Sequence, residues 1–241
     1  MDFIVNVFNL LISQPLFNYL VFLYSYLPGQ DFGIAVIVLT VSIKLILYPL
    51  SAKGIRAQKA LQDIQPKIKE LQQKFKNDKE KQVKAIMDFY KKEKVNPFSS
   101  ILPLFVQLPI LIGLFRVFSK GFGPEQFDRL YSFIEHPGLI DTTFLGIVDL
   151  AGPSMVLAFL AGVFQFVQAK MLTPKKIGPP DFSQMLQKQM VYFFPIFTVF
   201  LLWFIIPVSA IALYWLTITI FTICQQYITL KKYDSGKSEK N

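Results

Sequence analysis

The sequence lacks the residues from which disulfides and metal sites are built. Its 241 residues include one cysteine, Cys224, and one histidine, His136. One cysteine excludes an internal disulfide framework, and one cysteine with one histidine cannot supply a zinc site of the usual ligand count. We therefore expect no metal ion and no cofactor.

Recognisable catalytic motifs are missing as well. The sequence has no HExxH or GxSxG pattern and no pair of carboxylates within an apolar segment. His136 stands alone beside Pro137, and a lone loop histidine is far more often structural than catalytic. The sequence therefore gives no reason to predict an enzyme.

Apolar residues dominate what is present. Hydrophobic residues make up 53% of the chain and aromatic residues 15%, whereas charged residues make up 17%. An ordinary soluble domain is less apolar, and here the charges cluster between long apolar runs. This composition predicts a polytopic membrane protein. Its net charge of +9 suits an anionic lipid surface or an acidic partner.

The N-terminal segment, residues 1–28, has no lysine or arginine before its apolar run, unlike an ordinary signal peptide. Its polar side chains recur at helical spacing and form one stripe: Asp2, Asn6, Asn9 and Ser13. Pro15 then interrupts the pattern. We predict an amphipathic helix over residues 2–14 that lies in the membrane interface. A sixth span over residues 3–26 is the alternative.

Five further apolar segments are long enough to cross a bilayer. Pro207 divides the last apolar block, which favours a tight helical hairpin over one very long helix. The predicted fold class is all-α: five transmembrane helices, an N-terminal interfacial amphipathic helix and a cytoplasmic antiparallel helical hairpin. The predicted segments are transmembrane helices 29–50, 98–118, 154–171, 190–206 and 207–229, a basic cytoplasmic hairpin 51–97, an extracytoplasmic loop 119–153, a cytoplasmic loop 172–189 and a basic cytoplasmic tail 230–241.

The distribution of lysine and arginine orients these spans. Residues 51–100 hold thirteen basic residues against six acids, and residues 230–241 hold four lysines. The loop 172–189 is also basic, whereas the loop 119–153 has two basic residues against five acids. Because basic loops stay in the cytoplasm, we predict the N-terminus outside and the C-terminus in the cytoplasm.

Lys44 is the most unusual residue of the first span. No Asp, Glu or His shares its apolar stretch, residues 32–50. A charge at membrane depth costs about 2.5–3.5 kcal/mol on insertion scales. The side chain can reduce this cost by snorkelling toward the headgroups. The other explanation is that water, a partner or a substrate meets the charge.

Several amides lie within the other predicted spans. They are Gln107, Gln165, Gln168 and Gln225. Such groups often serve only as hydrogen-bonding contacts between helices. However, Lys44, Gln107, Gln168 and Gln225 all belong to the cytoplasmic halves of their spans. This common depth favours a wetted pocket that opens toward the cytoplasm and ends before the outer face.

The segment 53–95 has the pattern of two amphipathic helices. Apolar residues recur every three or four positions, at Ile64, Ile68, Leu71 and Phe75 and again at Val83, Ile86 and Tyr90. Asn77-Asp78 predicts the turn and helix cap between them, and Pro66 predicts a kink or the true start of the first helix. We expect an antiparallel hairpin that buries both stripes. Its basic face is either solvated near anionic lipid or a docking site.

A series of short motifs follows in order along the chain. They are Ser42-Ile43-Lys44-Leu45-Ile46-Leu47-Tyr48-Pro49-Leu50, Gln65-Pro66-Lys67, Asn96-Pro97-Phe98, Leu102-Pro103, Gln107-Leu108-Pro109, Phe194-Pro195 and Leu213-Tyr214-Trp215, with Gln225 ten residues after Trp215. In this order they resemble the YidC/Oxa/Alb family of membrane protein insertases. The likeness covers essentially the whole chain after residue 30, and the ordered set with its span pattern is what makes it specific.

The resemblance implies a five-span core, a cytoplasmic hairpin, and a hydrophilic groove open to cytoplasm and lipid with a positive charge in the first span. Two positions depart from the family pattern. Lys44 stands where the family usually has arginine, and Thr219 stands where it often has asparagine. With no large extracytoplasmic domain and no lipobox cysteine near the N-terminus, the resemblance is to a short bacterial form in the plasma membrane. A plastid or mitochondrial relative is the alternative.

The resemblance also implies insertion of nascent membrane proteins without ATP. The expected substrate groove comprises Lys44, Gln107, Gln165, Gln168, Trp215, Thr219 and Gln225, and the expected contact surface of the hairpin comprises Arg56, Lys59, Lys67, Lys74 and Lys84. Partners are nascent membrane proteins and lipids, with the Sec translocon and the ribosome as further candidates. No nucleic-acid specificity is expected, because acids are interleaved with the basic residues. A non-catalytic assembly scaffold and a transporter or channel are the alternative functions.

Overall fold

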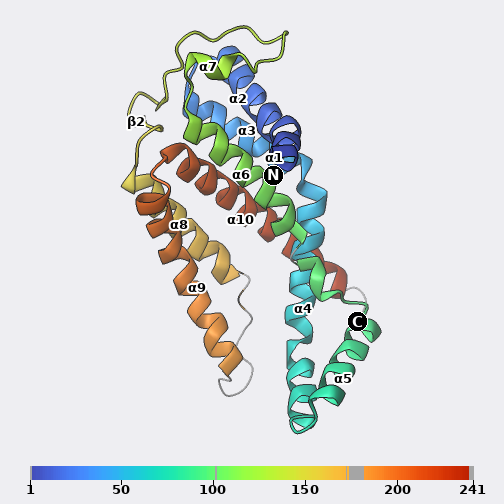
Figure 1. Ribbon diagram of the computed structural model, residues 1–241. Coiled ribbons are helices and arrows are strands. Elements are labelled where there is room, and N and C mark those ends of the chain that lie inside the picture. Colours follow the sequence, from blue (N-terminus) through green and yellow to red (C-terminus); the bar gives the residue numbers. More distant parts are fainter. Residues whose placement is uncertain (1, 101, 172, 174–181, 239–241) are drawn as a thin grey trace.

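The computed structural model describes residues 2–100, 102–171, 173 and 182–238, and these are mostly helical (Figure 1). The helices before the first long loop are α1 (Asp2–Phe8), the π-helix η1 (Asn9–Ser13), α2 (Gln14–Tyr26), α3 (Phe32–Ile46), α4 (Tyr48–Lys74), α5 (Lys79–Lys92), the 3-10 helix η2 (Pro97–Ser100) and α6 (Leu102–Lys120). After them come α7 (Pro124–Phe127), the strands β1 (Thr143–Phe144) and β2 (Val148–Asp149), α8 (Met155–Met171), α9 (Phe182–Phe200), the π-helix η3 (Leu201–Ile205) and α10 (Ser209–Ser238).

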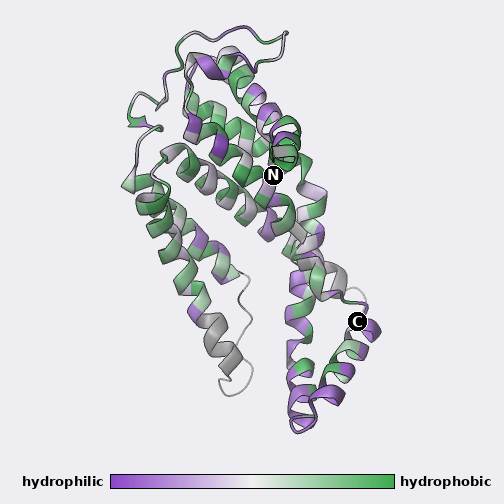
Figure 2. Ribbon diagram, viewed as in Figure 1, coloured by the Kyte–Doolittle hydropathy of each residue, from purple (hydrophilic) through white to green (hydrophobic). Residues whose placement is uncertain are grey.

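The core lies where α2, α3, α6, α8 and α10 meet. Figure 1 shows α7 and the two short antiparallel strands at one end of the molecule, and α4 and α5 at the other end with the C-terminus. The hydropathy colouring of Figure 2 separates a hydrophilic α4–α5 region from the largely hydrophobic α3, α6, α8 and α10. The acidic segment 119–153 and the basic segment 51–97 therefore lie at opposite ends.

The N-terminal helix does not end at Pro15. The chain stays helical from Asp2 to Tyr26, and Pro15 lies in the first turn of α2 directly after η1. A π-helix widens the backbone, and here Gln14 N–H donates to the Asn9 carbonyl. This widening leaves room for a proline ring that lacks a donor of its own. The expected interruption of the helix at Pro15 was therefore wrong, because the π-helix one turn earlier accommodates the proline ring.

The helix that carries Lys44 ends inside the segment predicted as the first span, residues 29–50. The helix α3 stops at Ile46, and α4 leaves at an angle of 67° to it. Pro49 has no N–H for the carbonyl of Leu45, so an uninterrupted helix is unfavourable there. Leu47 N–H still donates to the Ile43 carbonyl and closes the last turn of α3. Lys44 consequently lies in the last turn of α3, just before a sharp bend in the chain.

The helices α4 and α5 are in contact and are joined by the turn 75–78 (Figure 1). The predicted cap is confirmed, because the Asp78 carboxylate accepts from Lys81 N–H at 3.0 Å. Pro66 lies inside α4 and is not its start. Burial of the predicted stripes is incomplete: Val83 is 61% exposed. The cytoplasmic placement of this pair stays a prediction.

The last apolar block divides at Pro207. No helix covers residues 206–208, and α10 begins at Ser209, where its first two N–H groups donate to the carbonyls of Gly152 and Leu150. Gly162 allows α8 to approach α9 closely, because a Cβ there would lie 2.4 Å from a Val199 methyl carbon. The helices α8, α9 and α10 therefore form one tightly connected group.

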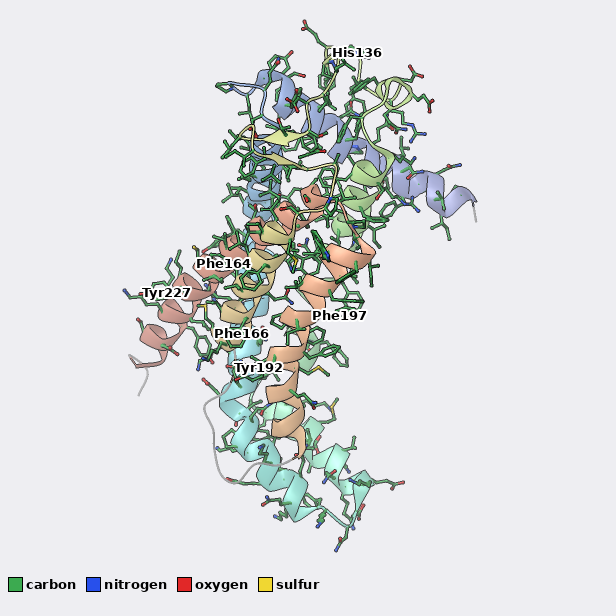
Figure 3. The ribbon with its side chains drawn as sticks, turned by 90° about the vertical axis from the view of Figure 1, so that its left-hand side faces the viewer. His136, Phe164, Phe166, Tyr192, Phe197 and Tyr227 are labelled. Carbon is green, nitrogen blue, oxygen red and sulfur yellow. The ribbon has the colours of Figure 1, made fainter. Side chains whose placement is uncertain are left out.

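Within the described residues, two helices are long and apolar enough to cross a membrane, Phe3–Tyr26 and Ser209–Ser235. The bent pair α3–α4 makes a third if it is counted as one span, and Met155–Met171 and Gln189–Ile205 are shorter apolar helices. In Figure 3 the segment 2–26 runs across the long direction of α8 and α9. The interfacial placement of this segment and the count of five spans stay predictions. Half of the predicted loop 172–189 lies outside the described residues, and the expectation of a loop up to residue 189 was wrong, because α9 already begins at Phe182.

Candidate functional site

Lys44 is buried in the protein and does not reach its surface. The side chain is 7% exposed, and its ammonium lies 5.7 Å from the centre of the Phe221 ring on α10. No described carboxylate lies within ion-pair distance of it. The Phe221 ring presents its negative face to the ammonium instead, and Lys44 lies in the last turn of α3, where the helix dipole favours a cation. Each is a weaker partner than a carboxylate, so the cation is only partly compensated.

Phe221 and Gln225 connect the bend after Lys44 to α10. The Tyr48 ring packs edge-on against Phe221, with 6.5 Å between ring centres. One turn further along α10, the Gln225 amide donates from Nε2 to the Tyr48 carbonyl at 3.0 Å. The other end of this amide, Oε1, is buried and has no hydrogen-bond partner among the described atoms.

Two further predicted residues meet α10 closer to its start. The Gln107 amide on α6 donates to the Tyr214 hydroxyl, and Tyr214 is almost fully buried. On the neighbouring face, the Trp215 indole N–H donates to Gln165 Oε1 on α8 at 3.1 Å. Thus α6 and α8 each bond to α10 through one amide.

The other two predicted groove residues make no bond to a neighbouring helix. The Thr219 hydroxyl donates to the Trp215 carbonyl of its own helix at 2.7 Å, although the residue is buried. Gln168 is half-buried and forms no hydrogen bond within the described part of the chain. These two positions therefore add polarity but no contact between helices.

Sequence reasoning missed several residues that belong to this cluster. They are Tyr48 and Phe221, together with the role of Tyr214 as the acceptor for Gln107. Spacing could have identified the two residues on α10: Tyr214, Ile218, Phe221 and Gln225 are four, three and four residues apart and share one helix face. The stripe meets Gln107, Lys44 and Tyr48 in turn, over roughly 16 Å of α10 at the helical rise.

This polar stripe of α10 has unused hydrogen-bonding capacity. Lys44 has three donors without a described carboxylate, and the Oε1 atoms of Gln225 and Gln226 are buried without partners among the described atoms. Buried polar groups in folded proteins nearly always find a partner, which is often water. The stripe can therefore hold water or a polar group of another molecule. The described residues include no cluster of three or more His, Cys, Asp or Glu side chains.

The basic residues of the α4–α5 pair are mostly solvent-facing. Arg56, Lys67, Lys74 and Lys84 are exposed, and Lys59 pairs with Asp63 at 3.1 Å. A partly buried surface pair of this kind contributes about 0–1 kcal/mol. The surface is therefore a set of accessible cations without a shaped site.

Comparison with known proteins identifies the family. The model of the 60Kd inner membrane protein family matches residues 22–237. A membrane protein insertase YidC of Citrifermentans bemidjiense is 37% identical over 186 residues, 76% of this chain and 31% of the relative. One of Clostridium tetani is 38% identical over 148 residues, 61% of this chain and 60% of the relative.

A third YidC insertase, of Wigglesworthia glossinidia brevipalpis, is 35% identical over 196 residues, 80% of this chain and 32% of the relative. The chain thus spans about a third of the length of the Citrifermentans and Wigglesworthia relatives. The family match includes the helices that carry Lys44, Gln107, Gln165 and the polar stripe of α10. This chain belongs to the 60Kd inner membrane protein family, the YidC/Oxa/Alb insertases that its ordered motifs resemble.

Proposed function

We propose that the protein inserts other proteins into the membrane without ATP. The observation that carries this proposal is the buried Lys44, whose ammonium faces an aromatic ring and no described carboxylate. Because a buried charge is costly, an ionisable residue in a membrane segment is by default a candidate site for a ligand of opposite charge. The ligand is the polar or acidic flank of an incoming hydrophobic segment.

The basic end of the molecule, with α4, α5 and the C-terminus, faces the cytoplasm in this proposal, and the loop 119–153 faces outward. Lys44 and Gln225 then lie on the cytoplasmic side of the membrane's centre. Water that enters from this side solvates the polar flank part of the way across. The flank therefore crosses less hydrocarbon than it would in a plain bilayer.

The incoming hydrophobic segment slides along the lipid-facing groove between the third and fifth predicted spans, α8 and α10. Both helices carry exposed apolar side chains, among them Val156 and Phe159 on α8 and Ile220 and Tyr227 on α10. Figure 3 shows this side of the molecule and labels Tyr227, together with Phe166 and Tyr192, whose rings lie 5.5 Å apart between α8 and α9. Burial of the segment in lipid then drives its release. The α4–α5 pair captures substrates, and ribosome or Sec contacts are further candidates.

The test is insertion into liposomes. The protein is reconstituted, a single-span substrate with a short acidic N-terminal tail is translated, and protease protection of the tail is measured. We expect protection to depend on the protein, to be lost in Lys44→Met and to be retained in Lys44→Arg. Methionine keeps most of the side chain's volume and removes only the charge, so this pair isolates the electrostatic effect.

Lys170→Met is the matched control, because Lys170 is an exposed lysine in the last turn of α8 that lies over the Phe166 ring. It should insert the substrate normally. Insertion by Lys44→Met at the normal rate would remove the role given to Lys44. Protein-independent protection would move the choice to an assembly scaffold, and ion flux through sealed vesicles would favour a channel.

A further inference from the structure

A second polar site lies away from the α10 stripe, between the N-terminal helices and α6. It is a cavity of about 310 Å³. Its lining residues are Asn6, Asn9, Leu10, Ser13, Gln14, Phe17, Arg116, Val117, Lys120, Gln126 and Arg129.

The polar stripe of the N-terminal helix faces this cavity. Asn6, Asn9 and Ser13 line it, whereas Phe3 and Leu11 on other faces of the helix are 79% and 67% exposed. This is the reverse of a helix in water, which turns its apolar side inward. An outward apolar face suits surrounding lipid, and the inward polar stripe then needs polar partners within the protein.

Those partners are only partly supplied. Arg116 on α6 donates from Nη1 to the Asn9 side-chain oxygen at 2.9 Å, and its guanidinium lies 5.0 Å from the centre of the Phe8 ring. The Ser13 hydroxyl is buried and forms no hydrogen bond with any described group. Arg116 uses one guanidinium N–H on Asn9, so its other N–H groups remain as donors at the cavity.

Three cations gather here without an anion. Arg116, Lys120 and Arg129 line the cavity, no Asp or Glu lines it, and none of the three is ion-paired to a described residue. The segment 119–153 has five acids and only two basic residues, yet both basic residues reach this cavity. Like charges that share one cavity repel each other, and a bound anion offsets this repulsion by its attraction to each cation.

The arrangement is built into the fold. The Arg129 carbonyl accepts from the side-chain amides of Gln14 and Asn18 at 3.1 and 3.0 Å, and Asn18 Oδ1 accepts from Tyr131 N–H at 2.6 Å. These bonds attach the loop after α7 to α2 and fix the backbone at Arg129. The backbone that carries Arg129 is thus held against α2 beside the cavity.

We propose that this cavity binds the phosphate of an anionic phospholipid headgroup. Guanidinium and ammonium groups are the common phosphate ligands of proteins, and serine and amide groups can complete the set. A lipid is favoured over free phosphate because exposed apolar residues of the same helix, such as Phe3, offer a surface for acyl chains. The bound headgroup joins the N-terminal helix to α6. The site is independent of the insertase proposal.

The experiment uses the full-length protein, delipidated in neutral detergent, with short-chain phosphatidylglycerol as the probe and short-chain phosphatidylcholine as its zwitterionic counterpart. Binding is followed by native mass spectrometry and by the thermal unfolding midpoint. We expect saturable binding of phosphatidylglycerol that raises the midpoint, and at least tenfold weaker binding of phosphatidylcholine.

The informative variant is Lys120→Gln with Arg129→Gln, because both side chains are exposed and their loss leaves the Arg116–Asn9 bond intact. It should bind phosphatidylglycerol at least tenfold more weakly. Lys91→Gln with Lys92→Gln removes the same charge from exposed positions on α5 and should bind normally. Equal losses in the two double variants overturn the proposal. Displacement by millimolar inorganic phosphate assigns a free-anion site, and displacement by an acidic peptide assigns a site for substrate tails; both outcomes overturn the lipid assignment.

Discussion

Replacing Gln225 by leucine tests whether this amide stabilises the fold or holds water in the polar site. The substitution removes one hydrogen bond, from Nε2 to the Tyr48 carbonyl, with a net value of about 1 kcal/mol. It also removes the buried Oε1, which has no described partner and whose desolvation costs about 1–3 kcal/mol. The variant should therefore be between about 0 and 2 kcal/mol more stable than the parent protein.

The matched comparison is Gln165→Leu. There the amide oxygen accepts from the Trp215 indole N–H, so the same change leaves a half-buried donor without its partner. We expect it to destabilise the protein by about 1–3 kcal/mol. The two glutamine-to-leucine variants should thus move the unfolding midpoint in opposite directions, measured in one detergent by thermal or denaturant unfolding.

The functional readout should separate from stability. Because Gln225 contributes polarity next to Lys44 and Phe221, its loss should slow substrate insertion even though the fold is at least as stable. Gln225→Leu that is clearly less stable than the parent would refute this reasoning and make the amide a structural contact between α10 and α4. Unchanged insertion in a stable variant would show that the amide does not hold functional water.

Two further changes test the fold away from the site. Gly162→Val should destabilise the α8–α9 contact by about 1–3 kcal/mol, because even its Cβ would meet Val199 and the Pro195 carbonyl. Gly152→Ala is the control, since its Cβ would meet only Asp149 Oδ2 at 3.9 Å. Equal unfolding midpoints for the two variants would contradict the packing argument. Hydrogen bonds from Lys81 to the Asp78 carboxylate lower the pKa of Asp78 below its usual range. The ionised carboxylate therefore stabilises the start of α5 fully above the unfolded-state pKa of Asp78. This stabilisation is lost as the pH falls through the lower folded-state pKa. Hydrogen exchange of the backbone amides in the first turn of α5 should accordingly become faster in acid. Asp78→Asn keeps an amide oxygen as the cap and should remove this pH dependence. Exchange that still becomes faster in acid in the variant would assign the effect to another group.

The helix breaks were predictable where one residue decides the backbone. Pro207 separates α9 from α10, and Asp78 caps α5, because a missing donor or a capping carboxylate acts locally. Pro15 misled for a related reason. A proline forbids only the regular hydrogen bond, and the π-helix before it offers an irregular backbone that no local pattern specifies.

The partners within the site were not predictable to the same degree. Lys44, Gln107, Gln165 and Gln225 could be selected because polar groups in apolar segments are conspicuous. Their contacts depend on the rotation of α10, which sets Trp215 toward α8 and Phe221 toward α3. Thr219 shows the limit of selection by polarity, since its hydroxyl bonds its own helix and reaches no neighbour.

The N-terminal polar stripe shows why a periodicity identifies a face without identifying its environment. Asn6, Asn9 and Ser13 were correctly grouped on one side of a helix, and the expectation for an interfacial helix places that side toward water. The structure turns it toward Arg116, because the unpaired guanidinium in α6 requires polar neighbours as strongly as the stripe does. In a chain with lipid around it, the apolar face needs no protein cover, so polar pairing decides the orientation. The same logic explains Lys44, whose side chain is buried and whose ammonium lies over the Phe221 ring.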